Sequence, residues 1–394
     1  MKYSGSNSQS MMKIIVVCTS SYVYGAEVAT LNLLEGLKKE GHDILAITST
    51  WTDGEFSKRL AELAISEKRL PFGTFSKKLT WQAISWTFNM LIRLPGLWLG
   101  WSRIFRHFQP DILIITNPKH GLYLYHWLDK VPSIIIEHSE KPISKENRWL
   151  YNILMKRLAG VVAVSHYLVA NIRQLGVASE KIHVIYNGIF SAGKKQHIDA
   201  LPQRKTADSA NPFKIGIVGQ ISPHKGHDCL LQATRLMNEK NRNFEVLVFG
   251  SGNPDYIAKL KHDLALANAD SIWQWKGYES RHDHIYPQFD ICVVPSQCDE
   301  AFGMTAVEAS AYGLPVVASR RGGLQEAVEE GVTGLLFESG NAQELADKIM
   351  QLMDSLDNYR QMSVAAQKRA FEVFSIEESA RRFSALLKTL ARHV

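Results

Sequence analysis

Residues 290–319, DICVVPSQCDEAFGMTAVEASAYGLPVVAS, read as one complete strand–loop–helix–strand unit. The apolar runs at 290–296 and 315–319 are rich in valine, which is typical of buried parallel strands. Small and apolar residues follow the Gly-Met-Thr turn between these runs, and we expect a helix to begin at Met304 or Thr305. Two strands of this kind joined through a helix predict an α/β fold with a parallel sheet.

The same alternation of apolar runs and helical stretches extends along all 394 residues. The runs lie at 12–20, 42–50, 111–117, 133–139, 160–166 and 182–188 in the first half, and at 213–222, 244–252, 271–278, 290–296, 315–319 and 334–338 in the second. Because both halves carry the pattern, we predict two Rossmann-like, doubly wound domains. In such sheets ligands bind outside the carboxyl ends of the strands, so we expect a cleft between the domains.

The domain boundaries follow from changes in composition. A polar tail at 1–11 precedes the first domain at 12–189, and a polar stretch with glycine and proline at 190–212 reads as a linker. The second domain covers 213–374. The amphipathic stretch 375–394 is predicted to be a helix that packs back toward the first domain.

Composition and charge exclude few classes of protein. Hydrophobic residues make up 45% and charged residues 21%, as in ordinary soluble proteins, and the net charge of +6 does not by itself indicate nucleic acid. The four cysteines form no C-x-x-C pair, which predicts reduced thiols in a cytosolic protein. The tail also lacks the apolar core of a signal peptide, so a cytoplasmic location is expected.

Two glutamates flank the start of the helix expected near Met304. A helix N-terminus suits a phosphate, and Gly303 would let a ligand approach the backbone closely. Glu308 lies about one turn into this helix, within reach of the vicinal hydroxyls of a ribose. Thr305 and Glu308 also form a capping-box pattern that needs no ligand, but such a box leaves Glu300 unexplained.

Lys225 precedes a second expected helix, which opens near Gly226 or His227. Its ammonium could meet a diphosphate there, although a solvated loop lysine is the alternative. The chain has no P-loop pattern, which disfavours a nucleotide-triphosphate motor. A tight turn is the favoured interpretation of VFGSGNP at 248–254. Asp255 stands where a dinucleotide fingerprint has its third glycine, so a hydride-transfer enzyme is disfavoured.

Two positions in the first half are also candidates. Gly25 lies at the first strand–helix junction, where a glycine is ordinary in α/β turns. His138 ends the run IIIEHSEKP at 134–142, at the carboxyl edge of the expected sheet. A single histidine in such a place is either structural or functional.

Three segments in order resemble the retaining glycosyltransferases of family 4, which have the GT-B fold. The segment VGQISPHKGHDCLLQA at 218–233 resembles the family's glycine–arginine–leucine…lysine–glycine segment. The segment EAFGMTAVEASAYGLPVVAS at 300–319 matches its glutamate, seven residues and glutamate, followed by Gly-x-Pro-Val-Val. RRGGLQEAVEEGVTGLLFESGN at 320–341 matches the segment that follows, and the resemblance runs from Lys13 to about Ala380.

The resemblance implies a role for each matched position. It implies that Glu300 lies at the donor sugar and that His138 lies beside the transferring sugar. The other implied roles are donor diphosphate binding by Lys225, Gln220, Gly25 and the backbone of Gly303, Met304 and Thr305, ribose binding by Glu308, and base binding near Tyr278. Gln220 departs from the family pattern, which has an arginine there; it can donate a hydrogen bond but carries no charge. No resident cofactor and no metal are implied.

The implied function is transfer of a sugar from a nucleoside diphosphate sugar to a glycan or lipid-linked acceptor. Such a reaction would serve the synthesis of cell-surface polysaccharide, lipopolysaccharide or glycolipid. Three alternatives stay open: a nucleotide-sugar epimerase, a phosphorylase of the same fold, and a non-catalytic nucleotide-sugar-binding subunit. A phosphorylase would be expected to carry a lysine-bound cofactor site, for which the chain shows no signature.

The segment 79–108 combines aromatic and basic residues without any acidic residue. Between Lys68 and Pro110 the basic side chains are Lys68, Arg69, Lys77, Lys78, Arg93, Arg103 and Arg106, interleaved with Trp81, Trp86, Phe88, Trp98, Trp101, Phe105 and Phe108. This composition predicts peripheral contact with an anionic membrane, at the inner face of the cell membrane. Its most apolar part, 86–101, is shorter than the roughly 20 residues of a spanning helix and is interrupted by Arg93 and Pro95. The alternatives are packing against the domain's own sheet and single-stranded nucleic acid, for which the chain shows no known module.

Overall fold

A computed structural model describes the chain except residues 1–10, 21–22, 53, 74–79, 192–210 and 393–394. Almost all of the predicted tail at 1–11 and of the predicted linker at 190–212 therefore lies outside the described residues. The chain forms two compact units. Unit 1 comprises 1–164, 168–188 and 376–394, and unit 2 comprises 165–167 and 189–375.

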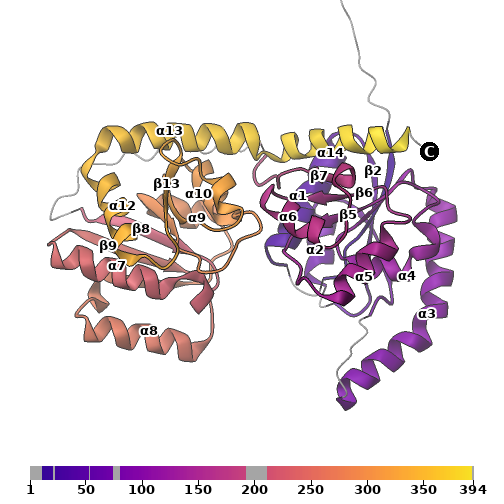
Figure 1. The fold of residues 1–394 in the computed structure, drawn as a ribbon, viewed down its shortest axis with the longest axis horizontal. Coiled ribbons are helices and arrows are strands. Elements are labelled where there is room, and N and C mark those ends of the chain that lie inside the picture. The colour runs from indigo at the N-terminus through magenta and orange to yellow at the C-terminus, as the bar shows by residue number, and fades with distance from the viewer. Residues whose placement is uncertain (1–10, 21–22, 53, 74–79, 192–210, 393–394) are drawn as a thin grey trace, which may run out of the picture. The chain divides into compact units, whose positions relative to one another are not determined.

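Unit 1 is built on a seven-stranded sheet, of which Figure 1 labels β2, β5, β6 and β7; the strand order is β3-β2-β1-β4-β5-β6-β7. All of its pairings are parallel. The strands are β1 (Lys13–Val17), β2 (Asp43–Ser49), β3 (Ser66–Leu70), β4 (Ile112–Ile115), β5 (Ser133–Glu137), β6 (Gly160–Ala163) and β7 (Ile182–Val184). The apolar runs predicted six of these strands and missed β3. That edge strand reads SEKRL and buries only Leu70, so it contains no apolar run.

Among the residues that the structure describes, six helices of unit 1 lie between its strands in the chain, and a seventh, α14, comes after unit 2. They are α1 (Gly25–Lys39), α2 (Glu55–Glu62), α3 (Trp81–Phe108), α4 (Pro118–Tyr123), α5 (Lys145–Leu154), α6 (Tyr167–Gln174) and α14 (Ile376–Ala391). α1 begins where the Glu27 carboxylate accepts a hydrogen bond from the Tyr24 N–H at 3.0 Å. It ends before Gly41, whose φ of 87° favours glycine.

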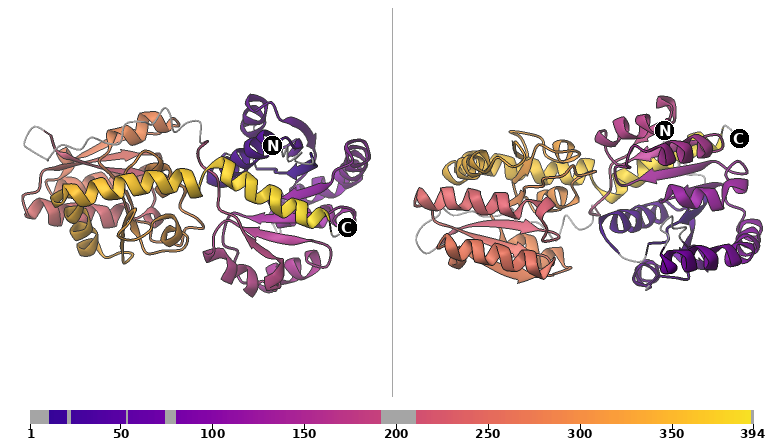
Figure 2. Two further views of the ribbon diagram at one scale, coloured as in Figure 1. Left: turned by 90° about the horizontal axis from the view of Figure 1, so that it is seen from above. Right: turned by 60° about the horizontal axis from the view of Figure 1, so that its bottom comes forward.

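α14 packs against α1 within unit 1, although unit 2 precedes it in the chain (Figure 2). The contact depends on Gly36, because a Cβ at that position would lie 2.7 Å from the Cβ of Ala380. On the same helix, Phe383 and Leu387 are buried, as the apolar spacing predicted.

Unit 2 is built on a six-stranded sheet in the order β10-β9-β8-β11-β12-β13, again with parallel pairings. Its strands are β8 (Phe213–Val218), β9 (Phe244–Phe249), β10 (Trp273–Gly277), β11 (Ile291–Val294), β12 (Val316–Ser319) and β13 (Gly334–Phe337). Its helices are α7 (His227–Glu239), α8 (Pro254–Leu266), α9 (His282–Ile285), α10 (Met304–Ala311), α11 (Leu324–Ala327), α12 (Ala342–Asp354) and α13 (Leu356–Val373).

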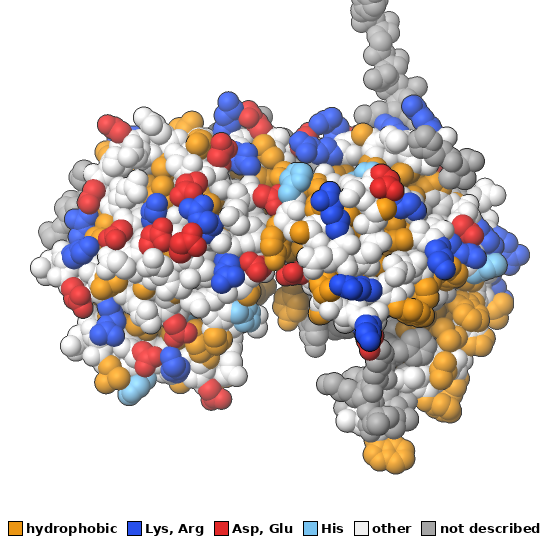
Figure 3. Space-filling model, viewed as in Figure 1, with side chains coloured by type: hydrophobic (Ala, Val, Ile, Leu, Met, Phe, Trp, Pro, Cys, Tyr) orange, Lys and Arg blue, Asp and Glu red, His pale blue; other side chains and the backbone are white. Residues whose placement is uncertain are grey.

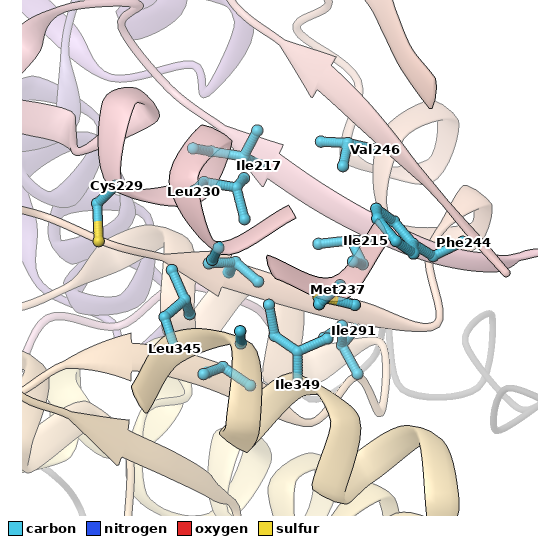
Figure 4. Close-up of a cluster of buried hydrophobic side chains, with 14 of the residues drawn as sticks. Ile215, Ile217, Cys229, Leu230, Met237, Phe244, Val246, Ile291, Leu345 and Ile349 are labelled. Atoms are coloured by element: carbon cyan, nitrogen blue, oxygen red, sulfur yellow. The ribbon is translucent and has the colours of Figure 1, made fainter. Parts of the chain in front are cut away.

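The core of unit 2 lies between its sheet and two helices. Ile215 and Val246 of the sheet belong to one buried cluster with Met237 of α7 and Leu345 and Ile349 of α12 (Figure 4). The cluster anchors the strands whose carboxyl ends carry the predicted donor-binding residues. Both sheets change the direction of their strand order at the first strand, β1 or β8. In open α/β sheets ligands bind at that point, beyond the carboxyl ends of the strands.

The helix α3 covers the basic and aromatic segment and continues through Pro95. Met90, Leu97 and Trp101 are fully buried in a cluster with strand residues of unit 1. Packing against the domain's own sheet therefore accounts for one face of α3. Residue 79, Lys77, Lys78 and the side chain of Trp86 lie outside the described residues. Within the described part of the chain, no helix combines the length and the apolar character needed to cross a membrane.

Candidate functional site

An ion pair between Lys225 and Glu300 lies at the switch point of the unit 2 sheet. The Lys225 Nζ donates to Glu300 Oε1 at 2.5 Å, and the Ser296 hydroxyl donates to the same oxygen at 2.7 Å. Lys225 ends a 3-10 turn after β8, and Gly226 then takes a φ of 77° to begin α7. A Cβ at Gly226 would overlap the carbonyl of Pro295. This glycine therefore allows the Lys225 loop to lie against the end of β11.

The main chain of Glu300 is held by the glycine pair 322–323. The Gly323 N–H donates to the Glu300 carbonyl at 2.6 Å, and a Cβ at Gly322 would overlap that carbonyl. Gly322 also has a φ of 50°, a conformation that side chains disfavour. Sequence reasoning assigned no role to these glycines or to Ser296. For the glycine pair, the available signal was two adjacent glycines after a strand. For Ser296, nothing in the sequence pattern indicated a role.

The helix α10 begins at Met304, as predicted, with Gly303 as its N-cap at a φ of 103°. Gly303 rather than Thr305 is the N-cap, so the capping-box interpretation of Thr305 and Glu308 is wrong. Glu308 instead accepts a hydrogen bond from the Tyr286 hydroxyl at 2.6 Å. A glycine at the N-cap lets an anion approach the start of the helix closely.

The loops after β8, β9 and β10 lie close together. The Gly250 N–H donates to the Gly277 carbonyl at 2.8 Å, and a Cβ at Gly250 would overlap the carbonyl of Gly219. Gly250 therefore allows the end of β9 to lie against the neighbouring strand ends, and the tight-turn interpretation of 248–254 stays a prediction. Gln220 is exposed directly after Gly219. Tyr278 follows the edge strand β10 and is 76% exposed; β9 separates that strand from β8, after which Lys225 lies.

A cavity of about 490 Å³ opens at the switch point of the unit 1 sheet. Its lining includes Cys18 after β1, Thr116 after β4, and Ala26, Glu27 and Thr30 of α1, together with His138, Lys141 and Tyr151. Gly25 is the exposed first residue of α1. The structure thus brings His138 to the first turns of α1, where it shares the cavity lining with Ala26, Glu27 and Thr30.

His138 is held as a neutral imidazole in this cavity. Its Nε2 lies 3.4 Å from the Thr30 hydroxyl, while its Nδ1 is buried without a hydrogen-bond partner. Burial lowers the pKa of His138 to about 4, and the charge of Lys141 contributes in the same direction. At pH 7 a neutral imidazole can accept a hydrogen bond from a sugar hydroxyl or donate one to it.

Glu137, the last residue of β5, was missed by sequence reasoning, which considered only His138 in the run 134–142. It is fully buried; the Tyr151 hydroxyl donates to one carboxylate oxygen, and the Lys141 ammonium lies 3.1 Å from the other. Burial raises the pKa of Glu137, against the charge of Lys141. The signal was a carboxylate at the end of an apolar run with a lysine four positions later. This anchored loop fixes the position of His138.

The described residues include His, Cys, Asp and Glu side chains in both units. Among these described residues, no three or more His, Cys, Asp or Glu side chains are grouped so that they could hold a metal ion.

Two family models match this chain, one in each half. Residues 23–190 match the model described as Glycosyltransferase Family 4, and residues 201–369 match the one described as Glycosyl transferases group 1. A lipopolysaccharide 1,2-N-acetylglucosaminetransferase of Salmonella typhimurium is 31% identical over 321 residues, which cover 74% of this chain and 83% of that protein. A D-inositol 3-phosphate glycosyltransferase of Corynebacterium urealyticum is 34% identical over 184 residues.

The match to the Corynebacterium protein covers 45% of this chain and only 43% of that protein's length. Among solved structures, Anabaena HepE in complex with UDP and glucose has a TM-score of 0.74 at 21% identity, over 96% of this chain and all of that one. These matches confirm the predicted family and fold class. The chain therefore belongs to the group 1 glycosyltransferases, with the two α/β units of the GT-B fold.

Proposed function

We propose that this protein transfers a sugar from a nucleoside diphosphate sugar to a glycan or lipid-linked acceptor, in the synthesis of cell-surface polysaccharide or glycolipid. The observation that carries the proposal is the Lys225–Glu300 pair beside the start of α10, whose N-cap is Gly303. The HepE structure, which holds UDP and glucose, and the likeness to a lipopolysaccharide N-acetylglucosaminetransferase support this class of substrate.

The donor diphosphate would be bound mainly by positive charge from unit 2. An ammonium has three N–H donors, and Lys225 directs one of them to Glu300. The others would serve the phosphates together with the backbone of residues 303–305 and the amide of Gln220. Glu308 would bind the ribose hydroxyls, and the loop at Tyr278 would contact the base. His138 and Gly25 of unit 1 keep the roles that the resemblance gives them, at the transferring sugar and at the phosphates.

The proposed chemistry is a front-face displacement with retention of configuration and without a metal. The bond between the anomeric carbon and the phosphate oxygen breaks, and the acceptor oxygen bonds to that carbon. The acceptor proton passes to the departing phosphate. Lys225 and the first turn of α10 would stabilise the charge that develops on the leaving diphosphate. In this single displacement Glu300, 2.5 Å from the Lys225 ammonium, would orient the sugar; as a nucleophile it would instead require a double displacement through a glycosyl-enzyme.

The acceptor would bind in the unit 1 cavity. Its volume of about 490 Å³ lies in the ordinary range of ligand sites, and its polar lining suits a hydroxyl-rich group. Among the described residues, four cysteines have free thiols. Three are buried, Cys18, Cys229 and Cys292, and Cys298 is exposed. Free thiols suit a reducing compartment, and we place the reaction in the cytoplasm.

A panel of UDP-, GDP- and ADP-sugars tests the proposal through release of nucleoside diphosphate, with and without a mixture of glycan and lipid-linked acceptors. A transferase releases nucleoside diphosphate in step with acceptor consumption. A new sugar isomer without acceptor would indicate an epimerase, and binding without turnover would indicate a non-catalytic subunit. NMR of the product linkage tests retention, and a chelator such as EDTA tests metal independence.

A further inference from the structure

The outer face of α3 carries a continuous apolar strip. Phe88, Ile92 and Leu99 are each 62% exposed, and their spacing places them on one side of the helix. Trp81, Leu91 and Trp98 are exposed along the same stretch. Figure 3 shows hydrophobic side chains gathered over this part of unit 1. We call these six residues the α3 strip. Soluble proteins rarely expose contiguous apolar surface of this kind without a binding role.

The opposite face of α3 fixes the orientation of the strip. Met90, Leu97 and Trp101 are fully buried in the core of unit 1. The Trp98 indole N–H also donates to the Tyr123 carbonyl at 2.9 Å. The helix therefore cannot rotate to bury the strip against its own sheet without removing these core residues. Among the described residues, the buried face of α3 packs in the core of unit 1, whereas the six residues of the α3 strip stay exposed.

The charged side chains of α3 and of the segment before it have one sign. No acidic residue occurs between Lys68 and Pro110. Continuing the spacing of the strip toward the end of the helix leads from Leu99 to Arg103 and Arg106, both exposed. An apolar strip that leads into arginines matches the boundary between acyl chains and anionic headgroups.

We propose that the α3 strip docks unit 1 onto an anionic lipid bilayer, with Phe88, Ile92 and Leu99 among the acyl chains and Arg103 and Arg106 at the headgroups. Two other occupants fit less well. The α3 helix of a second copy offers no acidic side chain to Arg103 and Arg106, so an interface between copies lacks charge complementarity. Single-stranded nucleic acid needs aromatic stacking platforms, whereas Leu91, Ile92 and Leu99 have no π face. Vesicle binding requires neither donor nor acceptor, so this inference stands apart from the proposed function.

Vesicle flotation of the full chain tests the inference. Wild type should float with vesicles of equal phosphatidylglycerol and phosphatidylcholine, and less with phosphatidylcholine alone or at high salt, because salt screens the arginines. The double variant Ile92→Glu/Leu99→Glu should lose at least tenfold in partitioning to the anionic vesicles. The matched control Leu266→Glu/Val364→Glu changes two exposed apolar residues of unit 2 and should float like wild type.

Circular dichroism and thermal melting check that both double variants fold, and nucleoside diphosphate binding checks that unit 2 is intact. Arg103→Gln/Arg106→Gln should weaken binding to anionic vesicles while leaving binding to neutral vesicles unchanged. The inference is overturned if wild type does not float at low salt, or if Ile92→Glu/Leu99→Glu floats as well as wild type. It is also overturned if that variant converts a wild-type dimer to a monomer in sedimentation velocity, or abolishes binding to a single-stranded oligonucleotide, without a change in flotation.

Discussion

The ammonium of Lys225 lies 2.5 Å from the Glu300 carboxylate, although 75 positions separate the two residues in the chain. They meet because β8 and β11 are neighbours in the unit 2 sheet, and each residue follows one of these strands. Both side chains stay partly exposed, and ion pairs of that kind contribute about 1 kcal/mol or less to stability. Changes to this pair should therefore alter ligand chemistry more than folding.

Glu300→Gln should cut turnover strongly and leave the fold intact. The amide keeps the shape of the side chain but loses the charge that would face the anomeric carbon. Steady-state release of nucleoside diphosphate measures the effect, and thermal melting checks the fold. Glu338→Gln is the matched control, because Glu338 also pairs with a cation, Arg320, on the surface of unit 2. Wild-type turnover in Glu300→Gln would remove this carboxylate from the chemistry.

Lys225→Met should weaken nucleoside diphosphate binding by roughly ten- to a hundredfold, since a hydrogen bond to a charged group contributes about 1.5–3 kcal/mol. Affinity for the nucleoside without phosphates should change little. Isothermal titration calorimetry with both ligands separates the two effects. The exposed Lys240, which pairs with Asp347, supplies the control Lys240→Met. Equal losses for nucleoside and nucleoside diphosphate would contradict a phosphate role.

Gln220→Arg should tighten donor binding, because it adds a charge at the position where the family pattern has an arginine. A gain of about 1–2 kcal/mol corresponds to roughly five- to thirtyfold in Kd, and salt should reduce it. Gln343→Arg adds the same charge at another exposed position and controls for net charge. If both variants tighten binding equally, the gain is a general charge effect and Gln220 does not face the diphosphate.

Glu308→Gln should reduce discrimination between a nucleoside diphosphate and its 2′-deoxy form. A carboxylate that accepts hydrogen bonds from ribose hydroxyls gives the ribonucleotide an advantage of roughly tenfold or more. Competition binding with both nucleotides measures this ratio in wild type and variant. Glu372→Gln, at an exposed position of unit 2, should keep the wild-type ratio. An unchanged ratio in Glu308→Gln would restrict Glu308 to its hydrogen bond with Tyr286.

Unit 1 should lose stability as the pH falls from about 6.5 to about 4. Burial lowers the pKa of His120 to about 4, with a smaller contribution from Lys119. Below about pH 6.5 the unfolded chain therefore binds a proton that the folded chain does not, until the pH reaches the folded pKa. The loss for this one histidine is on the order of 3 kcal/mol.

Thermal melting of wild type and His120→Gln between pH 7 and pH 4 measures that loss. The variant removes one titrating group, so its melting temperature should fall less steeply with acid. The exposed His262 gives the control His262→Gln, which should follow the wild-type profile. Parallel profiles for His120→Gln and wild type would contradict the assignment.

Much of the fold was predictable because buried parallel strands leave a local signal. The run 290–296 contains β11, and the glycine before Met304 indicated where α10 begins. The sequence did not predict β3, because SEKRL is a polar edge strand that buries only its last residue. Such a strand forms because it pairs in register with its neighbouring strand, and the local sequence does not show that pairing.

The candidate site was predictable as single residues and not as contacts. Lys225 and Glu300 were each expected at a strand end, but their pairing depends on the sheet order. The capping-box interpretation of Glu308 failed because Tyr286, 22 positions earlier, provides a tertiary partner that spacing along one helix cannot reveal. Glu137 was missed because the partners that make a buried carboxylate tolerable, Tyr151 and Lys141, are evident only in three dimensions.

The return of α14 to unit 1 constrains the order in which the two units can fold during synthesis on the ribosome. Strands β1 to β7 emerge first, but the helix that covers Gly36 is translated only after the whole of unit 2. In the nascent chain this side of α1 therefore stays uncovered until α14 has emerged. Unit 1 is complete only when α14 docks, with the Ser384 hydroxyl 2.9 Å from the His42 imidazole.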